Sequence, residues 1–222
     1  MFVVPEEFNQ NALNVRALAS PAETGRMLLE ETARRAGLQS LAEKDVLDFG
    51  CGSRFADAIV NLHIPLRSYV GVDTNARMID FLARNVPDKR LSFHYLNSFN
   101  YMYNRDGAPL TENTLLPIGE QQFDIICMFS VITHQSPEDA RHIFRMLRRY
   151  ARPGSALFFT ANIRGDIEYY LEEQPNDPCA LSAYSIELLG KLLRLGGWQI
   201  RSLEPRNVRG LPMMDSVLCV PL

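Results

Sequence analysis

The chain has 222 residues, of which 46% are hydrophobic and 22% charged, and its formal net charge is −3 at pH 7. These proportions exclude a disordered or fibrous protein, and the length suits one α/β domain over residues 1–222. Because Lys and Arg are scattered and do not gather on one segment, the composition also argues against a nucleic-acid partner.

Cysteine usage and hydropathy favour a protein of the reducing cytoplasm. The four cysteines lie far apart, match no metal-ligand spacing and are expected to be reduced: they are Cys51, Cys127, Cys179 and Cys219. The longest apolar run, residues 125–132, is much shorter than the roughly 20 residues of a membrane-spanning helix. Glu6 and Glu7 follow the first apolar residues too closely for a signal peptide. We therefore expect a cytoplasmic protein with no metal and no membrane partner.

The first expected elements are two helices within residues 11–40. This segment contains good helix formers, with apolar side chains at helical spacing. The pattern is interrupted at Ser20 and Pro21, where serine suits an N-cap and proline suits the first position of a second helix.

From residue 45 onward, short apolar segments alternate with helical ones. The predicted strands are residues 45–49, 68–72, 91–96, 123–129, 156–160, 198–203 and 215–220, and the predicted helices are residues 55–62, 76–85, 137–149 and 185–195. Such alternation is typical of βα units, so we expect an α/β fold with a mostly parallel, seven-stranded sheet and helices on both faces. Residues 98–122 break the rhythm as a long loop, and long loops in compact domains are commonly functional.

The strongest functional motif is the run Val46-Leu47-Asp48-Phe49-Gly50-Cys51-Gly52 at the end of the first strand. A Gly-x-Gly turn before a helix lets the backbone approach a ligand, and the N–H groups that start the helix attract negative charge. A tight turn without any ligand is the alternative explanation. A second acid, Asp73, ends the next strand about 20 residues later, where a carboxylate can accept hydrogen bonds from ribose hydroxyls. Together the two features favour a nucleoside-containing cofactor.

Asp48 distinguishes two candidate cofactors. A nicotinamide dinucleotide would place its pyrophosphate at the glycine turn, where Asp48 would repel it. S-adenosylmethionine carries a sulfonium and an ammonium group, both of which attract a carboxylate. The dinucleotide fingerprint also needs a third glycine where this chain has Phe55. The sequence favours S-adenosylmethionine, with an NAD-dependent oxidoreductase as the alternative.

In this order the motifs resemble those of class I S-adenosylmethionine-dependent methyltransferases of the bacterial type, over roughly residues 44–203. Besides the glycine turn, the matching runs are Gly71-Val72-Asp73, Tyr103-Asn104-Arg105-Asp106-Gly107, Phe123-Asp124-Ile125-Ile126 and Phe129-Ser130-Val131-Ile132-Thr133-His134. Residues 147–154 also match, as a segment that leads into a turn at Pro153-Gly154 before the fifth strand. The resemblance implies a Rossmann-like sheet whose last strand is antiparallel, and methyl transfer by in-line displacement to a small-molecule acceptor. It implies a cofactor site formed by Asp48, Gly50, Cys51, Gly52, Asp73, Thr74, Met78, Asn97, Ser98, Phe129 and Ser130.

Two departures from the family pattern fall within that site. The family's first motif continues to a third glycine, whereas Ser53 and Arg54 follow directly here. Arg54 therefore keeps open the alternative of a non-catalytic protein that retains the methyltransferase fold. The third strand leads into Asn97 where the family has an acid, and an asparagine carbonyl can still accept a hydrogen bond from an adenine amine.

The resemblance also places His134 after the fourth strand, near the expected meeting point of methyl group and acceptor. Histidine is suited to general-base chemistry near neutral pH. Hydrogen bonding to its own loop, or capping the helix that follows Ser136, is the alternative role.

Three tyrosines are candidates for an acceptor pocket, with ordinary packing as the alternative: Tyr101, Tyr103 and Tyr184. The helices of residues 11–40 and the loop of residues 98–122 are expected to cover the ligand site as a lid that excludes water.

Overall fold

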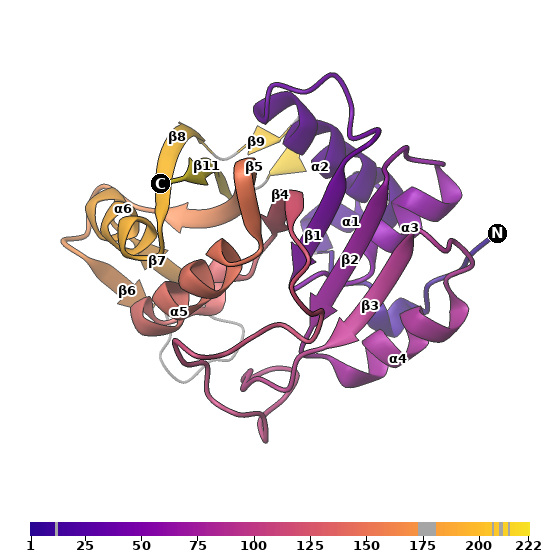
Figure 1. Cartoon of the computed structure of the whole chain (residues 1–222), viewed down its shortest axis with the longest axis horizontal. Helices are drawn as coiled ribbons and strands as arrows, with labels where there is room; N and C mark the ends of the chain where they lie inside the picture. The colour runs from indigo at the N-terminus through magenta and orange to yellow at the C-terminus, as the bar shows by residue number, and fades with distance from the viewer. Residues whose placement is uncertain (12, 173–180, 206, 209–210, 213) are drawn as a thin grey trace.

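The computed structural model describes the chain except for residues 12, 173–180, 206, 209–210 and 213, so Cys179 lies outside the described residues. Its main sheet has the strand order β3-β2-β1-β4-β5-β11-β8 (Figure 1). These strands are β1 (Asp45–Phe49), β2 (Ser68–Asp73), β3 (Leu91–Tyr95), β4 (Phe123–Met128), β5 (Ala151–Ile163), β8 (Trp198–Glu204) and β11 (Asp215–Pro221).

The pairing of these strands confirms the expected α/β fold. Strands β1 to β5 pair in parallel, whereas β11 lies between β5 and β8 and is antiparallel to both. The strand order reverses direction at β1, with β2 and β3 on one side of it and β4 and β5 on the other. The chain leaves β1 and β4 toward opposite faces of the sheet, and ligands of such folds bind in the crevice at this switch point.

The seven expected strands are all present, and the sequence missed four short ones. Strands β6 (Tyr170–Glu172) and β7 (Ser182–Tyr184) extend the sheet beside β5, and β9 (Asn207–Val208) pairs with β10 (Leu211–Pro212). Strand β5 also begins five residues earlier than expected, at Ala151 rather than Ala156. The sequence Pro153-Gly154 suggested a turn there, but the strand accommodates it as an irregularity, with Gly154 at φ 85°.

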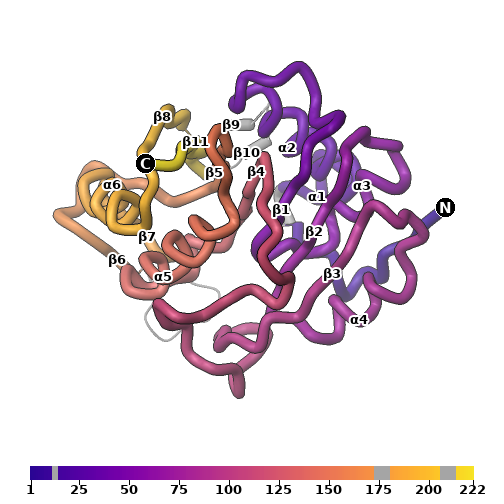
Figure 2. The backbone as a smooth tube through the Cα atoms, viewed as in Figure 1, coloured from indigo at the N-terminus to yellow at the C-terminus, as the bar shows by residue number. Residues whose placement is uncertain are grey.

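Helices cover both faces of the sheet (Figures 1 and 2). One face holds α2 (Pro21–Arg35), α3 (Arg54–Asn61) and α4 (Ala76–Asn85), and the other holds α5 (Pro137–Arg148) and α6 (Ile186–Leu195). Each layer packs on its own apolar core, so the sheet is buried on both sides. Short helical segments are η1 (Glu6–Phe8), α1 (Leu13–Arg16) and η2 (Ile132–His134).

The expected helix starts are confirmed in detail. The Ser20 side chain accepts a hydrogen bond from the backbone N–H of Glu23, with Pro21 as the first helical residue. Ser136 accepts from Asp139 N–H in the same way at the start of α5. The first of the two N-terminal helices is only one turn long.

Three cysteines of the described residues, Cys51, Cys127 and Cys219, are free and buried. Within the described part of the chain, no helix is both long and apolar enough to cross a membrane. The same residues contain no group of three or more His, Cys, Asp or Glu side chains placed to hold a metal ion.

The contact between α2 and α3 depends on Gly25. A Cβ atom at this position would lie 2.5 Å from the backbone oxygen of Arg54 and 2.9 Å from the Cβ of Ala58. The two helices approach closely only because position 25 has no side chain. Gly25 thereby fixes α2 against the helix that starts at the glycine turn.

Gly25→Ala should destabilise the fold by about 1 to 3 kcal/mol, even though alanine is the better helix former, because the added methyl overpacks the α2–α3 contact. Gly190→Ala in α6 is the matched control. Its Cβ would meet only the tip of the flexible Arg194 side chain, at 3.5 Å, so helix propensity should stabilise the protein by roughly 0.5 to 1 kcal/mol. Urea unfolding measures both changes, and stabilisation by both variants would contradict the tight contact at Gly25.

Candidate active site

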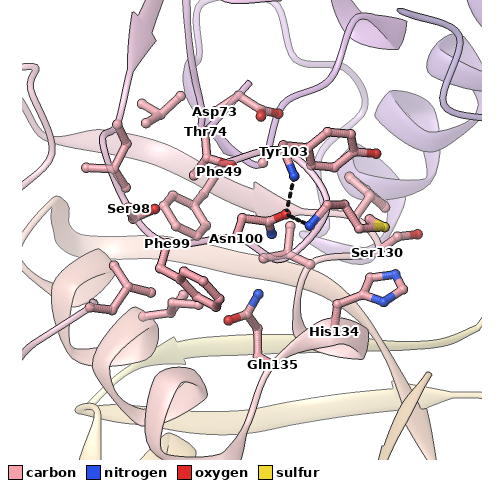
Figure 3. A pocket seen from close by; sticks show the side chains of 18 of the residues that line it. Phe49, Asp73, Thr74, Ser98, Phe99, Asn100, Tyr103, Ser130, His134 and Gln135 are labelled. Carbon is pink, nitrogen blue, oxygen red and sulfur yellow. Dashed lines mark hydrogen bonds between the residues drawn. The ribbon is translucent and has the colours of Figure 1, made fainter. Parts of the chain in front are cut away.

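A cavity of about 440 Å³ opens where the strand order reverses, at the carboxyl ends of the first four strands (Figure 3). Its walls come from the segments that follow β1, β2, β3 and β4, and Gln10 is contributed from the N-terminal segment. This volume lies within the usual range of small-molecule sites.

The turn after β1 forms one wall and requires glycine. Gly50 has φ 72°, and a Cβ atom there would lie 2.4 Å from a methyl group of Val131. The backbone N–H groups of Gly50 and Cys51 both donate to the carbonyl oxygen of Val72, at 2.8 and 3.2 Å. The turn is therefore fastened to the end of β2.

Asp73, the last residue of β2, holds the same turn through its side chain. One carboxylate oxygen accepts from Gly52 N–H at 3.0 Å, and the other accepts from Asn75 N–H at 2.9 Å. Burial raises the pKa of Asp73, and these backbone donors oppose the rise. The start of α4 is capped by Asn75, whose side chain accepts from Met78 N–H, so Asp73 is not the N-cap of that helix.

Asp48 lies beneath the turn, on the side of the sheet that faces α3, and does not line the cavity. Its carboxylate accepts a hydrogen bond from Tyr69 Oη at 2.8 Å and a weaker one from Cys127 Sγ at 3.6 Å. Burial raises the pKa of Asp48 to about 7, although the bond from Tyr69 and the positive charge of Arg54 both act to lower it. Direct contact between Asp48 and a cofactor was predicted, but the Asp48 side chain does not line the cavity.

Arg54, the residue that replaces the family's third glycine, is the first residue of α3 and lines the cavity. Burial lowers the pKa of its guanidinium, and the nearby charge of Asp48 counteracts this effect. Among the described lining residues, Arg54 is the one Arg or Lys and Asp73 is the one carboxylate. The cavity therefore carries one fixed charge of each sign.

The loop after β3 forms a second wall and is tied down by Asn104. The Asn104 side-chain amide donates to Ser98 O, to Asn97 Oδ1 and to Tyr95 Oη. A Cβ atom at Gly107 would lie 2.3 Å from Ser98 O, so the loop also closes on a glycine. Within the run Tyr103-Asn104-Arg105-Asp106-Gly107, the asparagine and the glycine thus shape the cavity wall without lining it.

The segment after β4 completes the cavity. Phe129 is buried, and Ser130 adopts φ 58° while its N–H donates to Thr160 Oγ1 at 2.8 Å. Non-glycine residues rarely adopt a positive φ, and those that do are found most often at functional sites. His134 and Gln135 follow on the same wall, close to Ser130 (Figure 3). Since Ser136 caps α5, the capping role considered for His134 is taken by another residue.

The structure brings together eight of the residues expected in the site and leaves seven outside the cavity lining. Those that line it are Gly50, Asp73, Thr74, Ser98, Tyr103, Phe129, Ser130 and His134. Those that do not are Asp48, Cys51, Gly52, Met78, Asn97, Tyr101 and Tyr184. Cys51 and Gly52 belong to the glycine turn, whereas Met78 is fully buried in the core between α4 and the sheet.

The three candidate tyrosines have different environments. Tyr103 is 43% exposed and lines the cavity, and Tyr101 lies at the surface with the Arg105 guanidinium 4.7 Å from its ring centroid. Tyr184 is completely buried, and its hydroxyl donates to the carbonyl oxygen of Gln135. Tyr184 therefore supports the His134–Gln135 segment from behind and does not face the cavity.

Several lining residues were not identified from the sequence: Gln10, Phe49, Val72, Leu96, Phe99, Asn100, Met102, Leu110, Val131, Gln135 and Ile143. Most of them adjoin recognised motifs, so extending each motif by a few residues would have found them. Gln10 had no such signal.

Gln10 reaches the cavity because the N-terminal segment runs along α3. The Asn61 amide donates to Phe2 O, and the Ser53 hydroxyl donates to Phe8 O at 2.8 Å. The side-chain oxygen of Gln10 then lies against Gly52, 2.1 Å from where a Cβ would be. Of the segment expected to act as a lid, α2 packs against α3, and closure over a ligand stays a prediction.

Comparison with known proteins identifies relatives of this fold. A family model described as a methyltransferase domain matches residues 22–202. The glycopeptide N-methyltransferase MtfA superposes with a TM-score of 0.60 at 13% identity, covering 99% of this chain and 100% of that chain. The 1,6-didemethyltoxoflavin-N1-methyltransferase of Burkholderia thailandensis, solved with bound 1,6-didemethyltoxoflavin and S-adenosylhomocysteine, gives a TM-score of 0.60 at 16% identity, covering 93% of this chain and 80% of that chain. An S-adenosylmethionine-dependent methyltransferase from Mesorhizobium loti gives 0.56 at 15% identity, covering 86% and 97%. At these identities the structural likeness concerns the fold.

Asp48→Asn should change how stability depends on pH. The pKa of aspartate is near 4 in the unfolded chain, and that of Asp48 is about 7 in the folded protein. Between these pH values the folded protein holds a proton that the unfolded chain has released. The free energy of unfolding of the wild type therefore falls as pH rises from about 4 to about 7. The variant keeps an oxygen acceptor for Tyr69 but lacks this loss, which is on the order of 4 kcal/mol. Its melting temperature relative to wild type should therefore rise between pH 5 and pH 8. A constant difference across that range would show that Asp48 titrates normally.

Proposed function

Because the chain belongs to the methyltransferase-domain family, we propose that it binds S-adenosylmethionine and transfers its methyl group to a small-molecule acceptor. The observation that carries the proposal is the joint geometry of the glycine turn and Asp73: a backbone turn open to close approach, held by a carboxylate that also faces the cavity. The S-adenosylhomocysteine bound in the similar Burkholderia structure supports this choice of cofactor.

The lining residues fit the chemistry of this cofactor along the sheet edge. Asp73 uses one lone pair of each carboxylate oxygen for a backbone N–H and retains others for ribose hydroxyls. Next to it, at the end of β3, Leu96 and Ser98 offer an apolar surface and a hydroxyl for the adenine. On the other side, at the end of β1, Gly50 allows the backbone to approach the amino-acid portion. In this proposal the cofactor lies along the strand order β3-β2-β1, with its adenine at the end of β3 and its amino-acid portion at the end of β1.

The acceptor then occupies the β4 side of the cavity. When bound, S-adenosylmethionine would supply a methyl group on a sulfonium, and the acceptor atom would bond to this methyl in line as the S–CH3 bond breaks and S-adenosylhomocysteine is left. Tyr103, Phe129 and Gln135 position the acceptor and shield it from water, which accelerates such a transfer through proximity. The imidazole of His134 takes the proton that the acceptor releases.

Cofactor binding tests the proposal directly. Wild type should bind S-adenosylhomocysteine in titration calorimetry, and Asp73→Asn should weaken binding by roughly 10-fold or more because it removes a charged acceptor. Asp80→Asn is the matched control, since Asp80 is exposed on α4, pairs with Arg84 and does not line the cavity. Equal affinity in wild type and Asp73→Asn would show that the site is elsewhere. A melting shift with NADH and none with S-adenosylhomocysteine would favour the oxidoreductase alternative.

Turnover is tested with methyl-labelled S-adenosylmethionine and fractionated cell extract. With the cofactor near its wild-type Kd, label should enter a low-molecular-mass fraction with wild type and do so several-fold more slowly with Asp73→Asn. With the acceptor in hand, His134→Gln should lower turnover by about 10²- to 10⁴-fold, as expected for loss of a general base, while the affinity for S-adenosylhomocysteine is retained. Cofactor binding without transfer to any fraction would favour a non-catalytic protein, and undiminished turnover in His134→Gln would remove His134 from the chemistry.

A further inference from the structure

Arg54 has an unusual environment for a cation. It lies mostly buried at the wall of the cavity, yet among the described residues no carboxylate oxygen lies within 4 Å of its guanidinium, and none of them accepts a hydrogen bond from it. The carboxylate beneath it, Asp48, is occupied by Tyr69 and Cys127. Burying a charge without a partner costs several kcal/mol, so such cations are normally paired. A partner for Arg54 is therefore expected from the ligand.

The position of Arg54 limits what that partner can be. It follows the glycine turn directly, on the β1 side of Asp73, where the proposed cofactor places its amino-acid end. That end carries a carboxylate, which is the only anionic group of S-adenosylmethionine. Guanidinium binds carboxylate through two parallel N–H bonds, which makes arginine a more specific partner than a backbone N–H.

Resting on the proposed function, we propose that Arg54 is a binding residue for the α-carboxylate of S-adenosylmethionine, and that it determines specificity for cofactors that possess this group. Arginine adds a positive charge at a position where the family's motif has an uncharged glycine. The residue that departs from the family pattern thereby strengthens cofactor recognition and does not block the cavity. Its charge also offsets that of Asp73, so that the two fixed charges of the cavity lining sum to zero.

The test is a thermodynamic cycle that crosses one protein group with one ligand group. Calorimetry measures the affinities of wild type and Arg54→Met for S-adenosylmethionine and for its decarboxylated analogue, which differs only by the missing carboxylate. Wild type should prefer S-adenosylmethionine by roughly 10- to 100-fold, the range of a charge-assisted hydrogen-bonded contact, and Arg54→Met should lose this preference. Arg54→Lys keeps the charge without the planar fork and should retain part of the preference.

Arg77→Met provides the matched control, because Arg77 lies in the first turn of α4, is 79% exposed, pairs with Glu7 and does not line the cavity. Its preference should equal that of wild type. Three results would overturn the inference: equal weakening of both ligands in Arg54→Met, which indicates a purely structural role; an unchanged preference in that variant; or no preference in wild type. Failure of wild type to bind either ligand would instead overturn the proposed function itself.

Discussion

One buried carboxylate holds the walls of the cavity together. Asp73 is removed from water, which is unfavourable for its charge, and backbone N–H groups from two different segments offset that cost. Through Gly52 it joins the turn after β1 to the end of β2, and the Val72 carbonyl reinforces the same connection. The neighbouring turns are arranged around this junction: Arg54 starts its helix two residues beyond Gly52, and Val131 packs against Gly50 from the β4 side. The cavity is therefore an outcome of how two strand ends are fastened.

Much of this arrangement could be predicted because it is locally encoded. The apolar runs define the strands, serine and proline define the helix starts, and the glycine turn and Asp73 sit at strand ends whatever the details of packing. Parallel strands carry their carboxyl ends to one edge, so the position of the site follows from the strand order. Each of these features is determined by residues that are close together in the sequence.

What could not be predicted depends on which way side chains point. Adjacent residues of a strand face opposite sides of the sheet, and the sequence of β1 does not say whether Asp48 or Phe49 faces the ligand. In the structure Phe49 lines the cavity, and Asp48 is buried against Tyr69. Tyr184 is similar: a tyrosine in a short strand is equally compatible with a pocket and with a core, and its long-range contact with Gln135 decides the matter. Contacts between distant segments, such as Gln10 with Gly52, leave no local pattern at all.

The N-terminal segment imposes an order of events on the formation of this protein. Phe2 and Phe8 bind to Asn61 and Ser53, so this segment, which leaves the ribosome before α3 does, has no docking surface until α3 has been synthesised and folded, some 50 residues later. Contacts over such sequence separations close slowly compared with those inside a helix or hairpin. The wall that Gln10 contributes is thus made before the other lining segments of the cavity and put in place after the glycine turn and α3 have formed. A nascent chain would display the glycine turn before its cavity has that wall, and the cavity would be complete only when the segment that carries Gln10 docks against α3.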